Sequence, residues 1–163
     1  MLDIKYPDPN IAIEDQSDII LLTMCIWAEA RGEQTIGQIA VGCCIRNRVI
    51  DPRANWWGNT WREVILKPRQ FSSFNKDLPS TPLNDEDPNR KKLLSPLAYG
   101  TVSEWSRCFY VAIGIFENLV NDVSRGANHY YSIPNYDISI PAPYWAVGKT
   151  PVFTWGRLKF YKL

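Results

Sequence analysis

The stretch IILLTMCIWAEARGE, residues 19–33, decides how the rest of the chain can fold. Its first ten residues are nearly all apolar, and a helix that is apolar around most of its surface belongs in the centre of a protein. Ser17 is placed to cap the start of this helix, and Gly32 is placed to follow its last turn. We therefore predict a central buried helix that ends on two carboxylates, Glu29 and Glu33.

Length and composition bound the possibilities. The chain has 163 residues, of which 45% are hydrophobic, so we predict one globular domain over residues 1–163. The 18 basic and 17 acidic residues nearly cancel, and no nucleic-acid partner is expected. The central apolar run is too short to cross a bilayer. The N-terminus lacks the features of a secretory signal, so we expect synthesis in the cytoplasm.

The rest of the chain alternates helical patterns with proline-rich breaks. Residues 1–12 read as an extended arm. A second buried helix begins at Thr35–Gln38, which we predict to be a capping box, and Pro52 stops it. Further helical patterns cover residues 60–67 and about 97–121. A polar surface loop is expected over residues 73–89, with solubilising acids at Asp77, Asp85, Glu86 and Asp87.

The C-terminal part has a different character. After Gly126 the chain is rich in proline and tyrosine, and its end indicates a hairpin around Trp155–Gly156. The four cysteines show no metal-ligand spacing, and we expect them to be small core residues in a reducing compartment. The fold class predicted is α+β, mainly α, with a small β-hairpin at the C-terminal end.

Glu29 is the candidate for chemistry. Apolar surroundings and the negative end of the helix dipole both disfavour its charged form, so both raise its pKa. A Glu that is protonated near neutral pH is what a general acid needs, although a helix-end Glu more often faces solvent. Arg31 would lower the pKa if it reached Glu29. Glu33 lies beyond Gly32, either as a solvated turn residue or as a second carboxylate.

Four short motifs occur in the order found in a known family. AEARGE (28–33), an apolar helix ending in NRV (47–49), QFS (70–72) and HYY (129–131) resemble the SleB-type cell-wall hydrolases, which include spore-cortex lytic enzymes and some phage endolysins. The resemblance runs from about residue 20 to the final hairpin, and AEARGE is its most specific part. Gln34 and Ser132 depart from the family, which often has proline and Asn-Pro at these places.

The resemblance implies a compact, lysozyme-like fold similar to lytic transglycosylases, with Glu29 as the catalytic acid. The implied substrate is the peptidoglycan glycan strand, cleaved at the β-1,4 bond between N-acetylmuramic acid and N-acetylglucosamine. One carboxylate suffices for a lytic transglycosylase that forms 1,6-anhydro ends, whereas a hydrolytic muramidase would use a second carboxylate. We expect a monomer with no cofactor and no metal, which reaches the wall by holin-type release if it is phage-encoded.

Further residues are candidates for substrate binding. Gln70 and Ser72 offer hydrogen-bond donors and Phe71 a packing surface, although the same triplet could be a turn with one core aromatic. His129 is the only histidine, and such a residue is more often structural than catalytic. Tyr130 or Tyr131 could stack on a sugar or orient Glu29, with at least one of them in the core. The predicted substrate-binding residues are therefore Glu33, Gln70, Phe71, Ser72, His129, Tyr130 and Tyr131. Of Trp56, Trp57 and Trp61, we expect two to be packing residues.

Three other classes compete with this hypothesis. A Cys–His enzyme would need a cysteine near His129, but all four cysteines fall in buried-looking helices. A zinc amidase would need several His or Cys ligands, and one histidine makes that class unfavourable. A non-enzymatic glycan-binding module would use the aromatic residues without Glu29.

Overall fold

The computed structural model describes residues 3–76, 88–134, 137 and 139–163. The predicted central helix is α1 (Asp18–Ala30), and residues 20–27 within it are all buried. It packs against α2 (Thr35–Val49) and α7 (Val102–Phe116), which also contact each other. These three helices form the core because each contributes a largely apolar surface to the same interior.

Shorter elements surround this core. They are η1 (Ile13–Asp15), α3 (Ala54–Trp57), α4 (Trp61–Leu66), η2 (Ser72–Phe74), α5 (Arg90–Leu93) and α6 (Pro96–Tyr99). Thr60 caps α4 by accepting a hydrogen bond from the Glu63 amide, so the expected helix over residues 60–67 is confirmed. The sequence pattern missed α3 and α5, because four-residue helices carry too little periodicity to detect.

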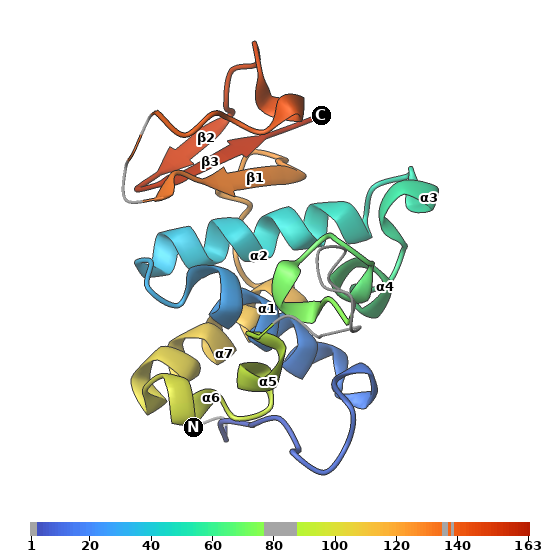
Figure 1. Cartoon of the computed structure of the whole chain (residues 1–163). Helices are drawn as coiled ribbons and strands as arrows, with labels where there is room; N and C mark the ends of the chain where they lie inside the picture. The colour runs from blue at the N-terminus through green and yellow to red at the C-terminus, as the bar shows by residue number, and fades with distance from the viewer. Residues whose placement is uncertain (1–2, 77–87, 135–136, 138) are drawn as a thin grey trace.

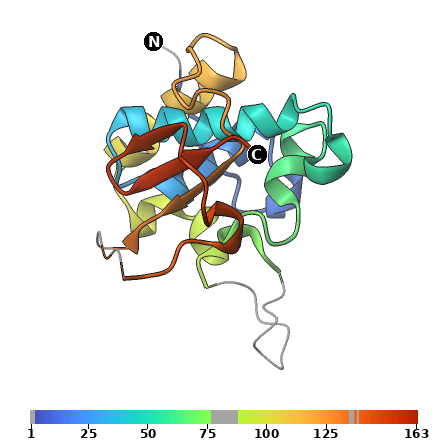
Figure 2. The same cartoon turned by 90° about the horizontal axis from the view of Figure 1, so that it is seen from above.

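A three-stranded antiparallel sheet completes the chain, with strand order β1-β3-β2. The expected C-terminal hairpin is β2 (Phe153–Trp155) and β3 (Leu158–Tyr161), and β1 (His129–Ser132) adds a strand that was not predicted. Figures 1 and 2 show the sheet lying over α2, on the side away from α1 and α7. β1 therefore brings the HYY motif close to the end of the central helix.

Of two predictions about helix ends, the capping box was wrong and the position of Gly32 was confirmed. The N-cap of α2 is Gln34, and no capping box forms at Thr35–Gln38. The Gln38 side chain is instead fully buried and donates to the carbonyl of Ala30, the last residue of α1, and to that of Glu33 just beyond it. Gly32 does follow the last turn of α1, but it does not take the left-handed conformation.

The helical pattern over residues 97–121 was also too long. Gly100 has an extended backbone between α6 and α7, and a capping box formed by Thr101 and Glu104 starts α7 afresh. Of the expected loop over residues 73–89, Phe74 is buried in η2, while residues 77–87, with the four acids named above, lie outside the described residues. Residues 3–12 form no helix or strand, as the arm prediction requires.

Candidate active site

Glu29 lies in the last turn of α1 and is partly buried. It borders an open cavity of about 350 Å³, whose lining is Trp27, Ala28, Glu29, Arg31, Ser72, Ser73, Asn89, Lys92 and Leu93. Larger hollows exist, such as one of about 410 Å³ beside Glu14 and Phe74, but they share no lining residue with the cavity of Glu29. The solvent-facing alternative is therefore wrong: Glu29 is a carboxyl group held at the wall of a polar cavity.

The pKa of Glu29 is raised, as the sequence predicts. Burial is the largest cause, because it disfavours the charged form. Two groups act in the opposite direction, the hydroxyl of Tyr130 and the positive charge of Arg48. Arg31 does not have the role considered for it, since its guanidinium lies over the ring of Trp27, 4.4 Å from the centroid. The acid is thus shifted towards its neutral form, while its ionised form keeps two stabilising neighbours.

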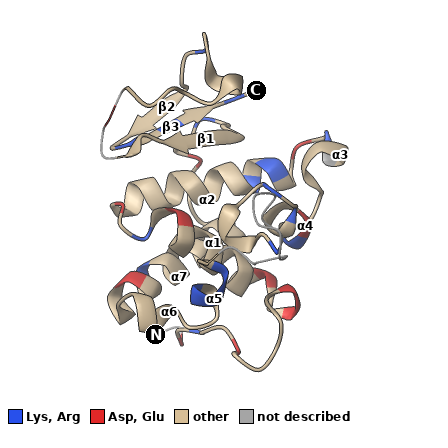
Figure 3. Cartoon of the chain, viewed as in Figure 1, with Lys and Arg blue, Asp and Glu red and all other residues tan. Residues whose placement is uncertain are grey.

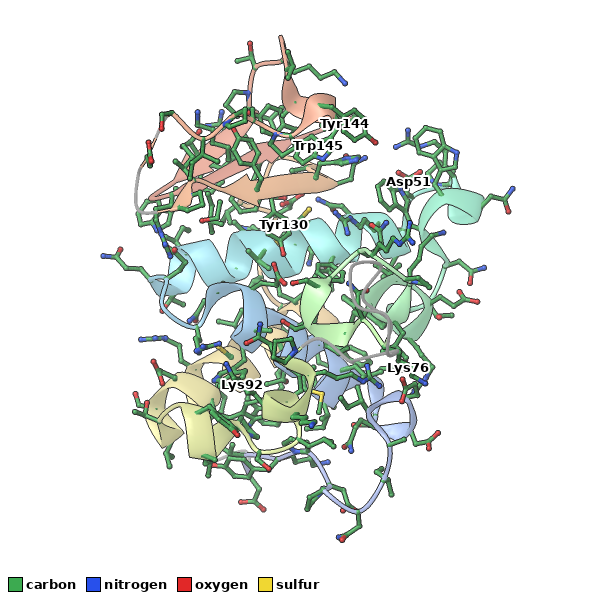
Figure 4. All side chains as sticks on the ribbon, viewed as in Figure 1. Asp51, Lys76, Lys92, Tyr130, Tyr144 and Trp145 are labelled. Atoms are coloured by element: carbon green, nitrogen blue, oxygen red, sulfur yellow. The ribbon has the colours of Figure 1, made fainter. Side chains whose placement is uncertain are left out.

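Tyr130 is the direct partner of Glu29. Its hydroxyl donates to Glu29 Oε2 at 2.8 Å, and its ring packs against Phe160 in the sheet. Figure 4 shows Tyr130 between β1 and α2. Lys92, which belongs to α5, lies on the opposite side of α2. Because alternate residues of a strand point to opposite faces, the side chain of Tyr130 faces the helices while those of His129 and Tyr131 face away.

Arg48, in the NRV motif, was expected only as a basic residue near the end of the second helix and not as part of the site. It is 6% exposed, and its guanidinium lies over the rings of Trp57 and Phe71 at 4.7 and 5.3 Å. Its Nε donates to the Asn128 carbonyl at 2.7 Å, and its Nη1 donates to Gln70 Oε1 at 3.2 Å. The Arg48 side chain therefore connects Asn128, just before β1, with Gln70 of the QFS motif.

The QFS residues divide between core and cavity. Ser72 is exposed and lines the cavity of Glu29. Phe71 is 2% exposed, so the idea that it offers a packing surface to substrate is corrected: it is the core aromatic of the alternative reading. The amide oxygen of Gln70 accepts a hydrogen bond from Arg48, so the group that Gln70 can still offer to a substrate is its amide nitrogen, a donor.

Glu33 is engaged elsewhere. Its Oε1 forms an ion pair with Arg157 Nη2 at 3.1 Å, which ties the end of α1 to the turn between β2 and β3. The Glu33 side chain is 13% exposed, so it is not the solvated turn residue of the first alternative. It is absent from the lining of the cavity that holds Glu29.

His129 and Tyr131 lie on the outer face of the sheet. His129 Nδ1 is 2.8 Å from Asn128 Oδ1, and its ring lies between those of Trp57 and Trp145. Burial, followed by the charges of nearby basic residues, lowers the pKa of His129 to about 4. Tyr131 stacks on Tyr161. The structure therefore does not bring these two candidates to Glu29.

The groups that rival chemistries need are placed unfavourably. All four cysteines are free and buried, and burial raises the pKa of Cys43 to about 11 and of Cys44 and Cys108 to about 12. In the part of the chain that the structure describes, no three His, Cys, Asp or Glu side chains are grouped so that they could hold a metal ion. The described helices include none that is long and apolar enough to span a membrane.

The charge pattern around the cavity is mixed. Figure 3 shows α5 as a basic helix beside the end of α1; it carries Arg90, Lys91 and Lys92. Of these, Lys92 lines the cavity, where it donates to Asn89 Oδ1 at 2.9 Å. Fold and site together define a mainly helical protein with a partly buried carboxyl group at a polar cavity.

Comparison with known proteins places this arrangement in a family. Residues 32–161, most of the chain, match the model of the Cell Wall Hydrolase family, and the chain belongs to that family. The matched range begins three residues after Glu29, so membership by itself does not include the acid. The family resemblance drawn from the sequence is confirmed.

Two curated relatives from Bacillus cereus, each called spore cortex-lytic enzyme, are 40% identical to the chain over 58 residues. That stretch covers 36% of this chain and 21%, about a fifth, of each relative's length. The catalytic domain of the Bacillus cereus SleB protein superposes with a TM-score of 0.55 at 20% identity, covering 96% of this chain and 95% of that one. This likeness shows a shared fold and confirms the predicted mainly helical, lysozyme-like class.

Proposed function

We propose that this protein degrades peptidoglycan by cleaving the β-1,4 bond between N-acetylmuramic acid and N-acetylglucosamine, with Glu29 as the only catalytic carboxylate. The observation that carries this proposal is the position of Glu29, partly buried at the wall of a polar cavity and hydrogen-bonded by Tyr130. Membership of the Cell Wall Hydrolase family supports the choice of polymer. Ser72 and Lys92 on the opposite wall offer donors for acetamido and hydroxyl groups.

In the first step Glu29 acts as the general acid. Burial raises its pKa, so a larger fraction is protonated near neutral pH than for an exposed Glu. Its proton passes to the bridging oxygen as the bond from that oxygen to C1 of the muramoyl residue breaks. The muramoyl ring then carries positive charge shared between C1 and its ring oxygen, and Glu29 is left ionised.

In the second step the same residue acts as the base. The muramoyl C6 hydroxyl attacks C1, and ionised Glu29 takes the hydroxyl proton. This closes the 1,6-anhydro ring and restores the protonated acid without any water. The hydroxyl of Tyr130 and the positive charge of Arg48 both favour the ionised carboxylate, and they stabilise it between the two steps.

The alternative is a hydrolytic muramidase in which a second carboxylate activates water. Glu33 is the candidate, but its carboxylate is paired with Arg157 and borders no part of the Glu29 cavity. This placement supports the one-carboxylate route. A binding module without catalysis would not require the raised pKa of Glu29, whereas a general acid does.

Analysis of the products tests the proposal. We expect mass spectrometry of muropeptides released in ¹⁸O-labelled water to show anhydro ends that contain no label. Reducing ends carrying one ¹⁸O would establish hydrolysis and overturn the transglycosylase step while leaving Glu29 as the acid. No release of soluble fragments from purified sacculi would overturn the enzyme proposal itself.

A further inference from the structure

A continuous group of aromatic rings runs from α3 onto the face of the sheet that points away from Glu29. Successive rings lie within 4.9–6.5 Å of one another, in the order Trp56, Trp57, His129, Trp145, Tyr131 and Tyr161. Trp57 and Tyr161 are buried at 6% and 3% exposure and serve as its base. We call this group, together with Tyr144, the outer aromatic surface.

Two members of the outer aromatic surface are exposed, although the guanidinium of Arg53 lies over the ring of Trp56, 4.8 Å from its centroid. Trp56 on α3 is 59% exposed, and Tyr144 at the start of η4 (Tyr144–Ala146) is 90% exposed. Figure 4 shows Tyr144 and Trp145 beside the sheet, on the side away from α2 and from Tyr130. Aromatic rings exposed to this degree are accessible to a ligand, and their flat faces match the apolar faces of sugar rings.

Positive charge lies beside these rings. Lys149 lies just after the segment that carries Tyr144 and Trp145, where its amide donates to the Ala146 carbonyl at 3.1 Å, and its charge and that of Arg53 both contribute to lowering the pKa of His129, after burial. Arg53 is neutralised by Asp51 at 2.7 Å. Lys149 is exposed, and among the described residues no carboxylate pairs with it. The chemistry therefore favours a ligand that combines sugar rings with carboxylates.

A hollow continues the surface along β1. It has a volume of about 390 Å³ and is bordered by Tyr131, Pro143 and Lys159, among others. This size lies within the range of about 300–1,000 Å³ typical of small-ligand pockets. A sugar substituent or a short peptide branch could enter it while the strand lies across the exposed rings.

We propose that the outer aromatic surface is a second glycan-binding site, which holds a peptidoglycan strand through sugar rings on Trp56 and Tyr144 and a stem-peptide carboxylate at Lys149. The choice of polymer rests on the proposed function. The site lies across the sheet from Glu29, so it retains the protein on the wall and takes no part in bond cleavage. Its ligand is the insoluble polymer rather than the fragment that fills the catalytic cavity.

Binding and cleavage are measured separately to test this proposal. Co-sedimentation with purified sacculi uses Glu29→Gln protein, which cannot digest its ligand, with and without Trp56→Ala and Tyr144→Ala. We expect the double substitution to weaken binding by about tenfold or more, as for the loss of two exposed aromatic anchors. Tyr110→Ala, which removes a 42% exposed tyrosine from α7, is the matched control and should leave binding unchanged.

Cleavage is followed with soluble muropeptide fragments and intact Glu29. In this cleavage assay the Trp56→Ala, Tyr144→Ala protein should match the wild type. In the binding assay, Lys149→Gln should weaken binding to sacculi but not to chitin, which lacks carboxylates. Unchanged sedimentation of the double variant, or an equal loss of fragment cleavage, would overturn the second site. Equal loss of chitin binding by Lys149→Gln would overturn the carboxylate contact. Failure of the proposed function would look different, since wild-type protein would then release no fragments whatever its binding.

Discussion

Replacing Tyr130 with phenylalanine removes one oxygen atom and with it the hydrogen bond to Glu29. The hydroxyl donates at 2.8 Å to a partly buried carboxylate, and hydrogen bonds to charged groups contribute about 1.5–3 kcal/mol. The bond favours the ionised form of Glu29, so its loss raises the pKa of Glu29 further above the ordinary value. Steps that form or use the carboxylate lose up to this free energy, which corresponds to a fall in kcat of about 10- to 100-fold.

The pH dependence gives the sign of the effect. The acid step needs protonated Glu29, so kcat/KM falls as pH rises through the pKa of that residue in the free enzyme. Tyr130→Phe should move this falling limb to higher pH while it lowers kcat. The assay is the initial rate of fragment release from purified sacculi across the pH range.

Tyr131→Phe is the matched control. It removes the same atom from the next residue, whose ring faces Tyr161 on the other side of the sheet. We expect the falling limb of its kcat/KM profile to lie at the same pH as in the wild type, and its kcat to be unchanged. An unshifted limb in Tyr130→Phe, or the same shift in both variants, would refute the reasoning that Tyr130 acts on Glu29.

Three further predictions concern groups near the site. Glu33→Gln should keep cleavage within about threefold of wild type, because Glu33 is paired with Arg157 and does not line the cavity of Glu29; loss of cleavage would restore the two-carboxylate route. Iodoacetamide should leave the activity of folded protein intact and label the four cysteines only after unfolding, since burial raises their pKa values; rapid inactivation would favour a cysteine nucleophile. The free energy of unfolding, measured by urea denaturation, should decrease as pH falls from 6.5 towards 4. The reason is that His129 binds a proton in the unfolded chain at a pH where the folded protein keeps it neutral. His129→Gln should make the free energy of unfolding depend less on pH over this range. A slope unaffected by that substitution would show that other groups cause the acid loss.

The sequence predicted those parts of the fold that local patterns control. The apolar run before Glu29 identifies α1 as the buried centre, and the final hairpin follows from turn chemistry. Gln38 was misread because a capping box and a buried polar side chain look alike in sequence. Which of the two forms depends on whether a neighbouring helix end leaves carbonyls to satisfy, and that is a tertiary property.

The site was predicted only in part, because its local motifs are visible in the sequence and its tertiary contacts are not. The motif AEARGE places Glu29 at a helix end, but its partner Tyr130 is 101 positions away, and the packing of β1 against the helices brings the two together. The alternation rule would have separated Tyr130 from His129 and Tyr131 had HYY been recognised as a strand. Arg48 gave no signal beyond its place in NRV, because a basic residue near a helix end is usually exposed, whereas here two aromatic rings and two oxygen acceptors bury it.

The central claim is that Glu29 carries the chemistry, and Glu29→Gln tests it most directly. Glutamine keeps the size of the side chain and an oxygen that can accept from Tyr130, but it has no proton to give. The measurement is release of soluble muropeptides from purified sacculi, with circular dichroism and sedimentation to confirm folding and binding. We expect Glu29→Gln to fold, to bind sacculi and to lose cleavage by at least about 10²–10⁴-fold, the usual contribution of a general acid. Cleavage at the wild-type rate by folded Glu29→Gln protein would contradict the account.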